Sequence, residues 1–171
     1  MKKIIISVAL ILALLLIAGA AFVVYVGNQP EQPVSAKTDQ QQNNPTVNGI
    51  LALINEERAK VGAQPLVIDD NVQQSAQLKA DDMDRNNYFD HIMPSTGKVL
   101  SPEMDRLLSS TCSDSSENIR DNDLAINTSE EAVTAWRDSA PHYKALVDKR
   151  YSKTGIGISG DKIVQHFCIA K

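Results

Sequence analysis

The chain of 171 residues carries no surplus of basic charge. Its 17 Lys and Arg residues are outnumbered by 21 Asp and Glu residues, and the formal net charge of −4 argues against a nucleic-acid-binding protein. Aromatic residues are scarce, at 5%, and the two cysteines are too far apart in sequence for a redox-active Cys-x-x-Cys pair. The remaining composition, with 43% hydrophobic and 22% charged residues, is that of an ordinary globular protein. The length allows one modest domain with appendages.

Residues 4–26 lack any charged side chain and follow Lys2 and Lys3. As a helix with a rise of about 1.5 Å per residue, this apolar run would be roughly 34 Å long, which exceeds a bilayer core of about 30 Å. The positive-inside rule places the two lysines in the cytoplasm and the rest of the chain outside. We therefore predict a signal anchor in residues 1–26 that crosses the membrane through residues 4–26.

A cleavable signal peptide is the alternative for this segment. Ala18-Gly19-Ala20 fits the small-x-small pattern of a cleavage site, although the apolar run continues past it to Val26. Both interpretations place the following residues outside the cytoplasm. Residues 27–46 contain few apolar residues and many Gln, Asn and Pro, which predicts a flexible linker before a domain at residues 47–171.

Periodic apolar residues and capping residues predict the secondary structure of this domain. Helices precede strands along the chain, with further helices between them, which indicates an α+β domain rather than a parallel α/β sheet. The last two strands flank Gly160-Asp161, a two-residue loop that suits a type II′ turn. The predicted elements are helices from Thr46 to Gly62, from Asp69 or Asp70 to Asn86-Asn87 (buried face Val72, Ala76, Ala80 and Met83), from Ser101 to Leu108 and from Thr128 through Trp136, extended segments at 64–68 and around Glu117, and strands at 154–159 and 162–169.

Cys112 and Cys168 are the two cysteines of the chain. In an oxidising compartment they most simply form one disulfide, which would stabilise the fold by roughly 4 kcal/mol according to the chain-entropy relation. The alternative is that both thiols are unpaired.

Several short motifs follow one another in an order that is typical of a known family. They are Asn55-x-x-Arg58, Gly62 with Pro65-Leu66, the series Ala76, Ala80 and Met83, Tyr88-Phe89-Asp90-His91, Ser116-Glu117-Asn118-Ile119, Trp136 to Leu146, Tyr151 to Gly157, and Gln165-x-Phe167. From Val47 to its end, the chain resembles a CAP-superfamily domain, also called the SCP domain. This superfamily includes cysteine-rich secretory, antigen-five and pathogenesis-related proteins, and the resemblance is greatest to its compact bacterial branch.

The resemblance implies a three-layer α-β-α sandwich with a central antiparallel sheet. It also implies a groove lined by His91, Glu117 and His142, which occupy the two histidine positions and the first acidic position of the family. The second acidic position holds Ser139, so that a charged partner for the histidines is missing there. The supporting groove residues that we predict are Ser139, Asn118 and Asp138.

Two imidazoles and a carboxylate can hold zinc or another divalent metal with an open fourth position and acidify a bound water. The alternative is that His91 and His142 are groove residues hydrogen-bonded to Glu117 and to the backbone, in a network that organises loops. Glu117 would then orient a histidine rather than act in catalysis.

Ser139 lies three residues before His142, but no strained turn or acid–histidine pair supports a serine nucleophile. His166, in a strand, is expected to be a packed histidine.

These observations predict a single-pass protein of the cell membrane whose C-terminal domain binds a ligand outside the cytoplasm. The resemblance implies an envelope or extracellular lipid, glycan or protein as the partner, and the scarcity of aromatic residues gives little support to sterol binding. A metal-dependent hydrolase of peptide or cell-envelope polymer is the alternative, and a purely structural or adhesion module is a third possibility. Trp136 is expected to belong to the core rather than to a ligand site.

Overall fold

The computed structural model describes residues 44–121 and 128–171. The predicted anchor in residues 1–26 lies outside the described residues, as do residues 27–43 of the predicted linker. Within the described ranges, no helix combines the length and the apolar character that crossing a bilayer requires.

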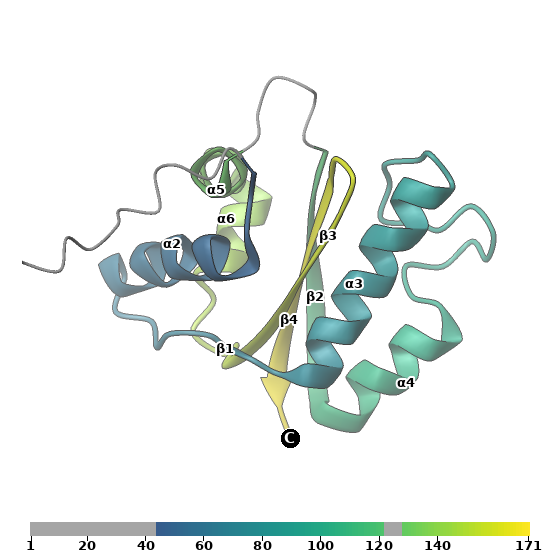
Figure 1. The fold of residues 1–171 in the computed structure, drawn as a ribbon. Helices are drawn as coiled ribbons and strands as arrows, with labels where there is room; N and C mark the ends of the chain where they lie inside the picture. The colour runs from purple at the N-terminus through teal and green to yellow at the C-terminus, as the bar shows by residue number, and fades with distance from the viewer. Residues whose placement is uncertain (1–43, 122–127) are drawn as a thin grey trace, which may run out of the picture. The chain divides into compact units, whose positions relative to one another are not determined.

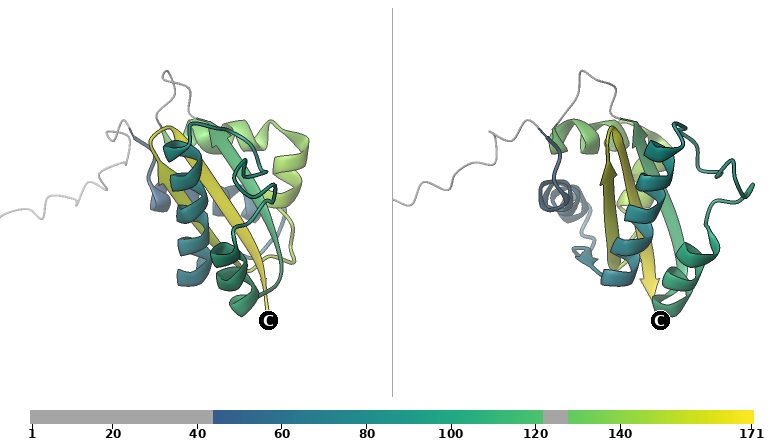
Figure 2. Two further views of the ribbon diagram at one scale, coloured as in Figure 1. Left: turned by 90° about the vertical axis from the view of Figure 1, so that its right-hand side faces the viewer. Right: turned by 45° about the vertical axis from the view of Figure 1, so that its right-hand side comes forward.

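Helices lie on both faces of a central sheet (Figures 1 and 2). On one face are α2 (Val47–Lys60), α5 (Ser129–Arg137) and α6 (Ala140–Leu146), and on the other are α3 (Asp70–Arg85) and α4 (Pro102–Thr111). The described residues therefore form the three layers that the sequence resemblance implies.

The sheet has four strands in the order β1-β3-β4-β2. β4 (Lys162–Ala170) is antiparallel to β3 (Lys153–Ser159) and to β2 (Cys112–Asp121), whereas β1 (Val67–Ile68) is parallel to β3. The sheet is therefore mixed, and the prediction of a wholly antiparallel sheet is wrong at the β1 edge. The cause lies in the connection, because no hairpin joins β1 to β3: the chain between them runs through α3, α4, β2, α5 and α6, and strands that are not joined by a tight turn can pair in parallel.

Side-chain caps confirm the predicted starts of the helices. Thr46, Asp69, Ser101 and Thr128 each accept a hydrogen bond from a backbone N–H in the first turn of the helix that follows. These short polar side chains satisfy N–H groups that a helix leaves without a partner at its start. α4 is longer than predicted and ends at Thr111, so that β2 begins at the next residue.

Two glycines allow the C-terminal hairpin to approach α3. Gly160 has a φ of 53° and Asp161 does not share this left-handed conformation, which is the pattern of the predicted type II′ turn. A Cβ atom on Gly160 would lie 2.3 Å from Oδ1 of Asp84, at the end of α3. A Cβ atom on Gly157 would lie 2.2 Å from the carbonyl oxygen of Ala76. A larger residue at Gly157 would push the backbone of α3 away from the sheet, whereas at Gly160 it would strain the turn and displace the Asp84 side chain.

Apolar side chains fill the space on both sides of the sheet. Trp136 is 1% exposed and packs in the larger core cluster between the sheet and α2, α5 and α6, as predicted. Its indole Nε1–H donates to the carbonyl oxygen of Ile119 at 3.1 Å, so that α5 is bonded to β2. On the other side of the sheet, the predicted buried face of α3 is confirmed for all of its members, Val72, Ala76, Ala80 and Met83.

Arg58 ties α2 to the loop that follows it and to the distant segment between α6 and β3. The residue is 0% exposed, and its guanidinium donates to four backbone carbonyl groups. A buried guanidinium has to satisfy its donors within the protein, and carbonyl oxygens do so here. The acceptors are the carbonyl oxygens of Gln64, Leu146, Asp148 and Tyr151, at 2.8 to 3.1 Å.

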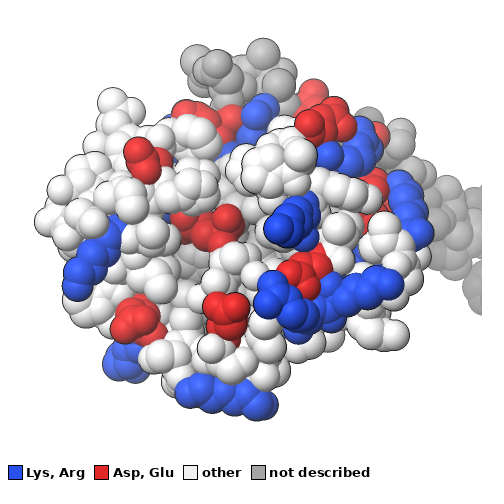
Figure 3. Space-filling model, turned by 180° about the vertical axis from the view of Figure 1, so that it is seen from behind, with Lys and Arg blue, Asp and Glu red and all other residues white. Residues whose placement is uncertain are grey.

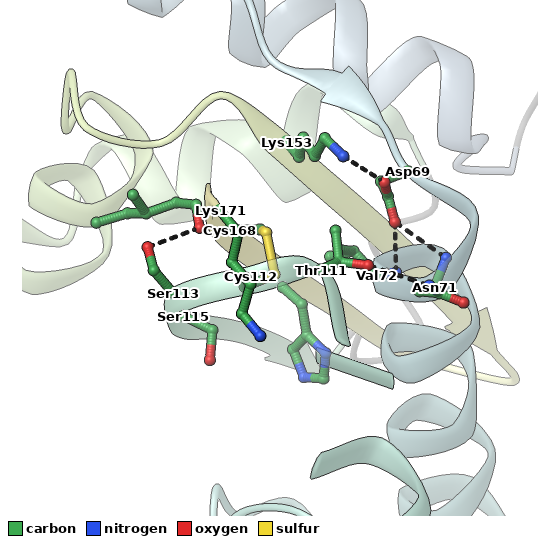
Figure 4. The surroundings of a disulfide bond; sticks show 12 residues. Asp69, Asn71, Val72, Thr111, Cys112, Ser113, Ser115, Lys153, Cys168 and Lys171 are labelled. Carbon is green, nitrogen blue, oxygen red and sulfur yellow. Dashed lines mark hydrogen bonds and ion pairs between the residues drawn. A yellow bond between two sulfur atoms is a disulfide. The ribbon is translucent and has the colours of Figure 1, made fainter. Parts of the chain in front are cut away.

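Cys112 and Cys168 form the predicted disulfide, with their Cα atoms 5.3 Å apart. The bond joins the first residue of β2 to β4 and packs against Val72 at the start of α3 (Figure 4). Nearby, Nζ of Lys153 donates to the carboxylate of Asp69 at 2.8 Å. Since β2 lies at the edge of the sheet, the disulfide fixes an edge strand to its one neighbour.

Loss of the disulfide should weaken the fold substantially. The two cysteines are 56 residues apart in sequence, and closing a loop of that length corresponds to roughly 4 kcal/mol in the chain-entropy relation. We expect the variant Cys112→Ala/Cys168→Ala to lose about that much free energy of unfolding in urea titrations. A loss below about 1 kcal/mol would contradict this role.

Candidate functional site

Glu117 lies at the centre of a hydrogen-bonded cluster of side chains. Its Oε1 is 2.7 Å from Nδ1 of His91, and its Oε2 is 3.0 Å from Nε2 of His166. The other ring nitrogen of His166, Nδ1, is 3.1 Å from Oγ of Ser75. These four side chains therefore form one continuous chain of hydrogen bonds, which we call the Glu117 cluster.

The pairing of β2 with β4 places Glu117 beside His166. The two residues are direct partners in the antiparallel register of these strands. Side chains of directly opposite residues project from the same face of a sheet, and here that face is covered by α3. Ser75, on the buried face of α3, meets the imidazole of His166 from the helical layer.

His91 lies in the loop that follows α3. Asn87 has a φ of 51°, a left-handed conformation that turns the chain after the helix. Lys79, which is 0% exposed, donates from Nζ to the carbonyl oxygen of His91 at 2.7 Å and to the hydroxyl oxygen of Tyr88 at 3.4 Å. A buried ammonium group on α3 therefore holds the loop that carries His91.

His142 belongs to the opposite helical layer. It lies on α6, is half-buried, and accepts a hydrogen bond at its carbonyl oxygen from Nδ2 of Asn118 at 3.2 Å. Asn118 follows Glu117 in β2, so that its side chain projects to the other face of the sheet. The structure thus brings His91 and Glu117 into contact and links His142 to the next residue of the same strand.

The other two predicted groove residues lie at the junction of α5 and α6. Asp138 is exposed at the end of α5, and its Oδ1 accepts a hydrogen bond from Nε of Arg137 at 3.2 Å. Ser139 occupies the position before α6 without forming a side-chain cap. Among the residues that the structure describes, neither side chain is hydrogen-bonded to the Glu117 cluster.

The pKa values of the two groove histidines are shifted in opposite directions. The hydrogen bond to Glu117 raises the pKa of His91, although partial burial opposes this effect. Burial lowers the pKa of His142, and the charge of His91 lowers it further. Burial alone would raise the pKa of Glu117, but the hydrogen bonds from His166 and His91 outweigh burial and lower it. Glu117 is therefore held as an anion, and His91 protonates more readily than His142.

The donor groups do not complete the metal site that the sequence predicts. Within the described ranges, no three His, Cys, Asp or Glu side chains are grouped so as to hold a metal ion. Each oxygen of Glu117 is hydrogen-bonded to an imidazole, which leaves Nε2 of His91 and the ring of His142 as the remaining donors of the predicted trio. Two imidazoles are fewer than the three protein ligands of a catalytic zinc site. Binding of zinc or another divalent metal stays a prediction.

Sequence reasoning missed the role of His166 and did not identify Ser75 or Lys79 as neighbours of the site. His166 is packed, as expected, but it is also a hydrogen-bond partner of Glu117, and Ser75 and Lys79 were not singled out at all. A histidine on a strand face covered by a helix has to find a hydrogen-bond partner, and this is the signal that the sequence offers. The identity of the partner depends on the register between β2 and β4, which local sequence patterns do not determine.

Comparison with known proteins agrees with the motifs and the fold. Residues 51–169 match the CAP family, described as the Cysteine-rich secretory protein family. YkwD of Bacillus subtilis is 34% identical over 120 residues, which are 69% of this chain and 45% of YkwD. The membrane protein YlbC of the same organism is 32% identical over 120 residues, which are 69% of this chain and 33% of YlbC. The chain thus spans less than half the length of these curated relatives.

Two solved bacterial structures have a similar fold. An extracellular SCP-domain protein from Bacillus anthracis has a TM-score of 0.63 at 24% identity, over 82% of this chain and 44% of that chain. An outer surface protein from Borrelia burgdorferi has a TM-score of 0.62 at 23% identity, over 71% of this chain and 90% of that chain. At these identities, the likeness concerns the fold alone.

The mixed sheet between two helical layers, with a histidine–glutamate cluster on its edge strand, defines an α+β sandwich of the SCP type. Since the family match covers most of its length, the chain belongs to the CAP, or Cysteine-rich secretory protein, family.

The opposite pKa shifts of the groove histidines predict distinct titrations. The chain has 3 histidines, so that labelling histidine with ¹⁵N gives three ring systems to follow by NMR. We expect His91 to titrate above the ordinary histidine value of about 6.5 and His142 below it. The variant Glu117→Gln removes the negative charge and should therefore lower the pKa of His91.

The same shifts set the sign of the pH dependence of stability. Because folding raises the pKa of His91, its contribution is complete below about pH 6.5 and is lost as the pH rises through the folded value. Folding lowers the pKa of Glu117, so that its contribution is present above about pH 4.3 and is lost as the pH falls through the folded value. A titration in which His91 loses its proton at a lower pH than His142 would contradict these assignments.

Proposed function

We propose that this chain is a membrane-tethered, extracytoplasmic module that binds an envelope or extracellular ligand at the groove of His91, Glu117 and His142. The observation that carries the proposal is the bond between a His91 side chain that is 46% exposed and a Glu117 side chain that is 6% exposed. A buried carboxylate thereby orders an accessible imidazole before any ligand arrives. Such preorganisation reduces the entropy lost on binding.

Three exposed apolar side chains lie in the same segment as His91, between α3 and α4. Phe89, Ile92 and Val99 are 47%, 44% and 38% exposed, respectively. Apolar residues that gather on one exposed segment are a recurrent feature of interaction surfaces. Together with the ordered imidazole, they favour a ligand that has an apolar portion next to a hydrogen-bonding group. Lipids, glycans and proteins of the envelope all include such ligands.

The face of the molecule shown in Figure 3 gives no support to recognition by a broad electrostatic field. On the face shown in Figure 3, acidic and basic side chains are interspersed. A surface of this kind provides little long-range steering for a uniformly charged polymer. Short-range contacts of the histidines and the apolar loop would therefore determine which ligand binds.

The proposed location rests on the uncharged run of residues 4–26 and on the names of relatives. YlbC is named a membrane protein, the Bacillus anthracis relative an extracellular protein, and the Borrelia burgdorferi relative an outer surface protein. The names of the two solved relatives support a domain outside the cytoplasm, and the name of YlbC supports attachment to the membrane, for which the uncharged run supplies the anchor. Secretion after cleavage of a signal peptide is the alternative.

A metal-dependent hydrolase of peptide or envelope polymer receives less support. Such an enzyme needs a carboxylate that directs a lone pair at the metal or at a water, whereas the described hydrogen bonds of Glu117 direct its oxygens at two histidines and its side chain is 6% exposed. We therefore derive no catalytic step. If zinc binds, Nε2 of His91 and the ring of His142 are the nitrogens that would hold it.

Sedimentation with bacterial envelopes tests the binding function. Full-length protein in detergent should sediment with envelope material, and His91→Ala/His142→Ala should weaken this binding by about tenfold or more, because the groove loses both imidazoles. Glu56→Ala, an exposed change on α2, is the control and should bind normally.

Envelopes stripped of lipid and protein distinguish a polymer ligand from the other two classes. Retained binding to stripped envelopes indicates glycan, and binding to untreated envelopes alone indicates lipid or protein. Full sedimentation of the double histidine variant, or no sedimentation of the wild type, would refute binding of an envelope ligand at the groove.

Calorimetry with zinc separates the binding module from the hydrolase. With two imidazole ligands, we expect the full chain to bind zinc more weakly than a Kd of about 1 μM and to lose the heat signal in His91→Ala/His142→Ala. Binding should also weaken at acidic pH as the histidines protonate. A stoichiometric zinc site of micromolar or tighter affinity that requires both histidines would instead favour the hydrolase.

A further inference from the structure

We propose that His166 and Ser75 are positioning residues of the groove. Acting through Glu117, they hold His91 as the tautomer that carries its proton on Nδ1 and leaves Nε2 free to meet a ligand. This role deepens the proposed function and rests on it, because a ligand meets Nε2 of His91 only if the groove binds one. The tautomer itself can be measured without any ligand.

Glu117 accepts hydrogen bonds but has none to donate. An ionised carboxylate has acceptor lone pairs and no donor, so that each ring nitrogen bonded to it has to carry a hydrogen. The nitrogens in question are Nδ1 of His91, at 2.7 Å, and Nε2 of His166, at 3.0 Å. The Glu117 side chain is 6% exposed, so that water cannot readily replace either donor.

His166 supplies the hydrogen bond to the second carboxylate oxygen of Glu117. The residue is 1% exposed and faces Glu117 across the strand pair, where it supplies the donor for Oε2. The buried positive charge of Lys79 also acts on Glu117, but the hydrogen bonds of Lys79 run to the backbone of His91 and to Tyr88. Among the described residues, His166 is thus the one donor to Oε2, and without it that oxygen is buried and unpaired.

Ser75 fixes the orientation of the His166 ring. Oγ of Ser75 lies 3.1 Å from Nδ1, and Ser75 is 0% exposed on α3. A hydroxyl group serves either form of the ring, because it donates to a bare nitrogen and accepts from a protonated one. Ser75 therefore satisfies Nδ1 in both cases and keeps Nε2 directed at Glu117.

These hydrogen bonds determine the tautomer of His91, the accessible histidine. The bond from Nε2 of His166 to Oε2 orients the carboxylate, so that Oε1 of Glu117 faces Nδ1–H of His91. The bond made by one ring nitrogen decides which nitrogen is protonated in a neutral histidine. Nε2 of His91, on a side chain that is 46% exposed, is then a bare acceptor or ligand nitrogen whose direction is fixed from within the fold.

The test is to read the ring tautomers of full-length, ¹⁵N-histidine-labelled protein in detergent, at a pH above the pKa of His91. In the wild type, we expect the Nδ1–H form of His91 to dominate and Nε2 of His166 to be protonated. His166→Met removes the donor to Oε2, and we expect the single Nδ1–H form of His91 to be lost in favour of a mixture. His166→Gln retains an N–H at a similar distance and should restore the wild-type pattern.

Gln165→Met is the matched control for these variants. Gln165 is also a buried polar residue of β4, but it projects to the opposite face of the sheet and donates to Thr154 rather than to Glu117. It should therefore affect stability without changing the tautomer of His91. Ser75→Ala should broaden the His166 signals and change His91 less than His166→Met does.

Two outcomes would overturn the proposal. One is a wild-type spectrum in which neutral His91 carries its proton on Nε2, and this measurement stands even where His166→Met does not fold. The other is a folded His166→Met protein that keeps the wild-type tautomer of His91. Because no ligand is present, these outcomes are independent of the envelope-binding experiment, which tests the proposed function by itself.

Discussion

The pairing of β2 with β4 is the constraint on which the candidate site depends. β2 is an edge strand, so that β4 is the neighbour that fixes its register. A slip of one residue would turn Glu117 to the opposite face of the sheet and separate it from His166. The disulfide between Cys112 and Cys168 opposes such a slip, because it fixes the start of β2 against β4. The stability of the sheet edge and the geometry of the site therefore have one origin.

Two buried cations, one in each helical layer, hold the segments that carry the groove histidines. Lys79 on α3 donates to the carbonyl oxygen of His91. Arg58 on α2 donates to the carbonyl oxygen of Leu146, the last residue of the helix that carries His142. Each cation is fully buried, so that moving the segment away would leave a desolvated charge without one of its acceptors. The two histidines thus approach β2 from opposite layers, and each is held by its own layer.

Local signals in the sequence were sufficient for much of the fold. Caps such as Thr46 and Asp69 act within one helical turn, and the Gly160-Asp161 turn depends on adjacent residues, so that all three could be predicted. The parallel pairing of β1 and the bond between Glu117 and His166 could not, because both depend on how segments far apart in sequence meet. The motifs identified Glu117 through its own neighbours, whereas the role of His166 arises from strand register alone.

The orientation of Glu117 also bears on the chemistry that the groove supports. A general base or a metal-binding carboxylate directs a lone pair at the substrate or the metal, but Glu117 directs one oxygen at each of two imidazoles. The family's second acidic position holds Ser139, and the neighbouring Asp138 is bonded to Arg137, so that no described hydrogen bond brings a second acid to the cluster. The groups that remain accessible are the imidazole of His91 and apolar side chains. The proposal of a binding module rests on these groups, because they offer hydrogen bonding and apolar contact.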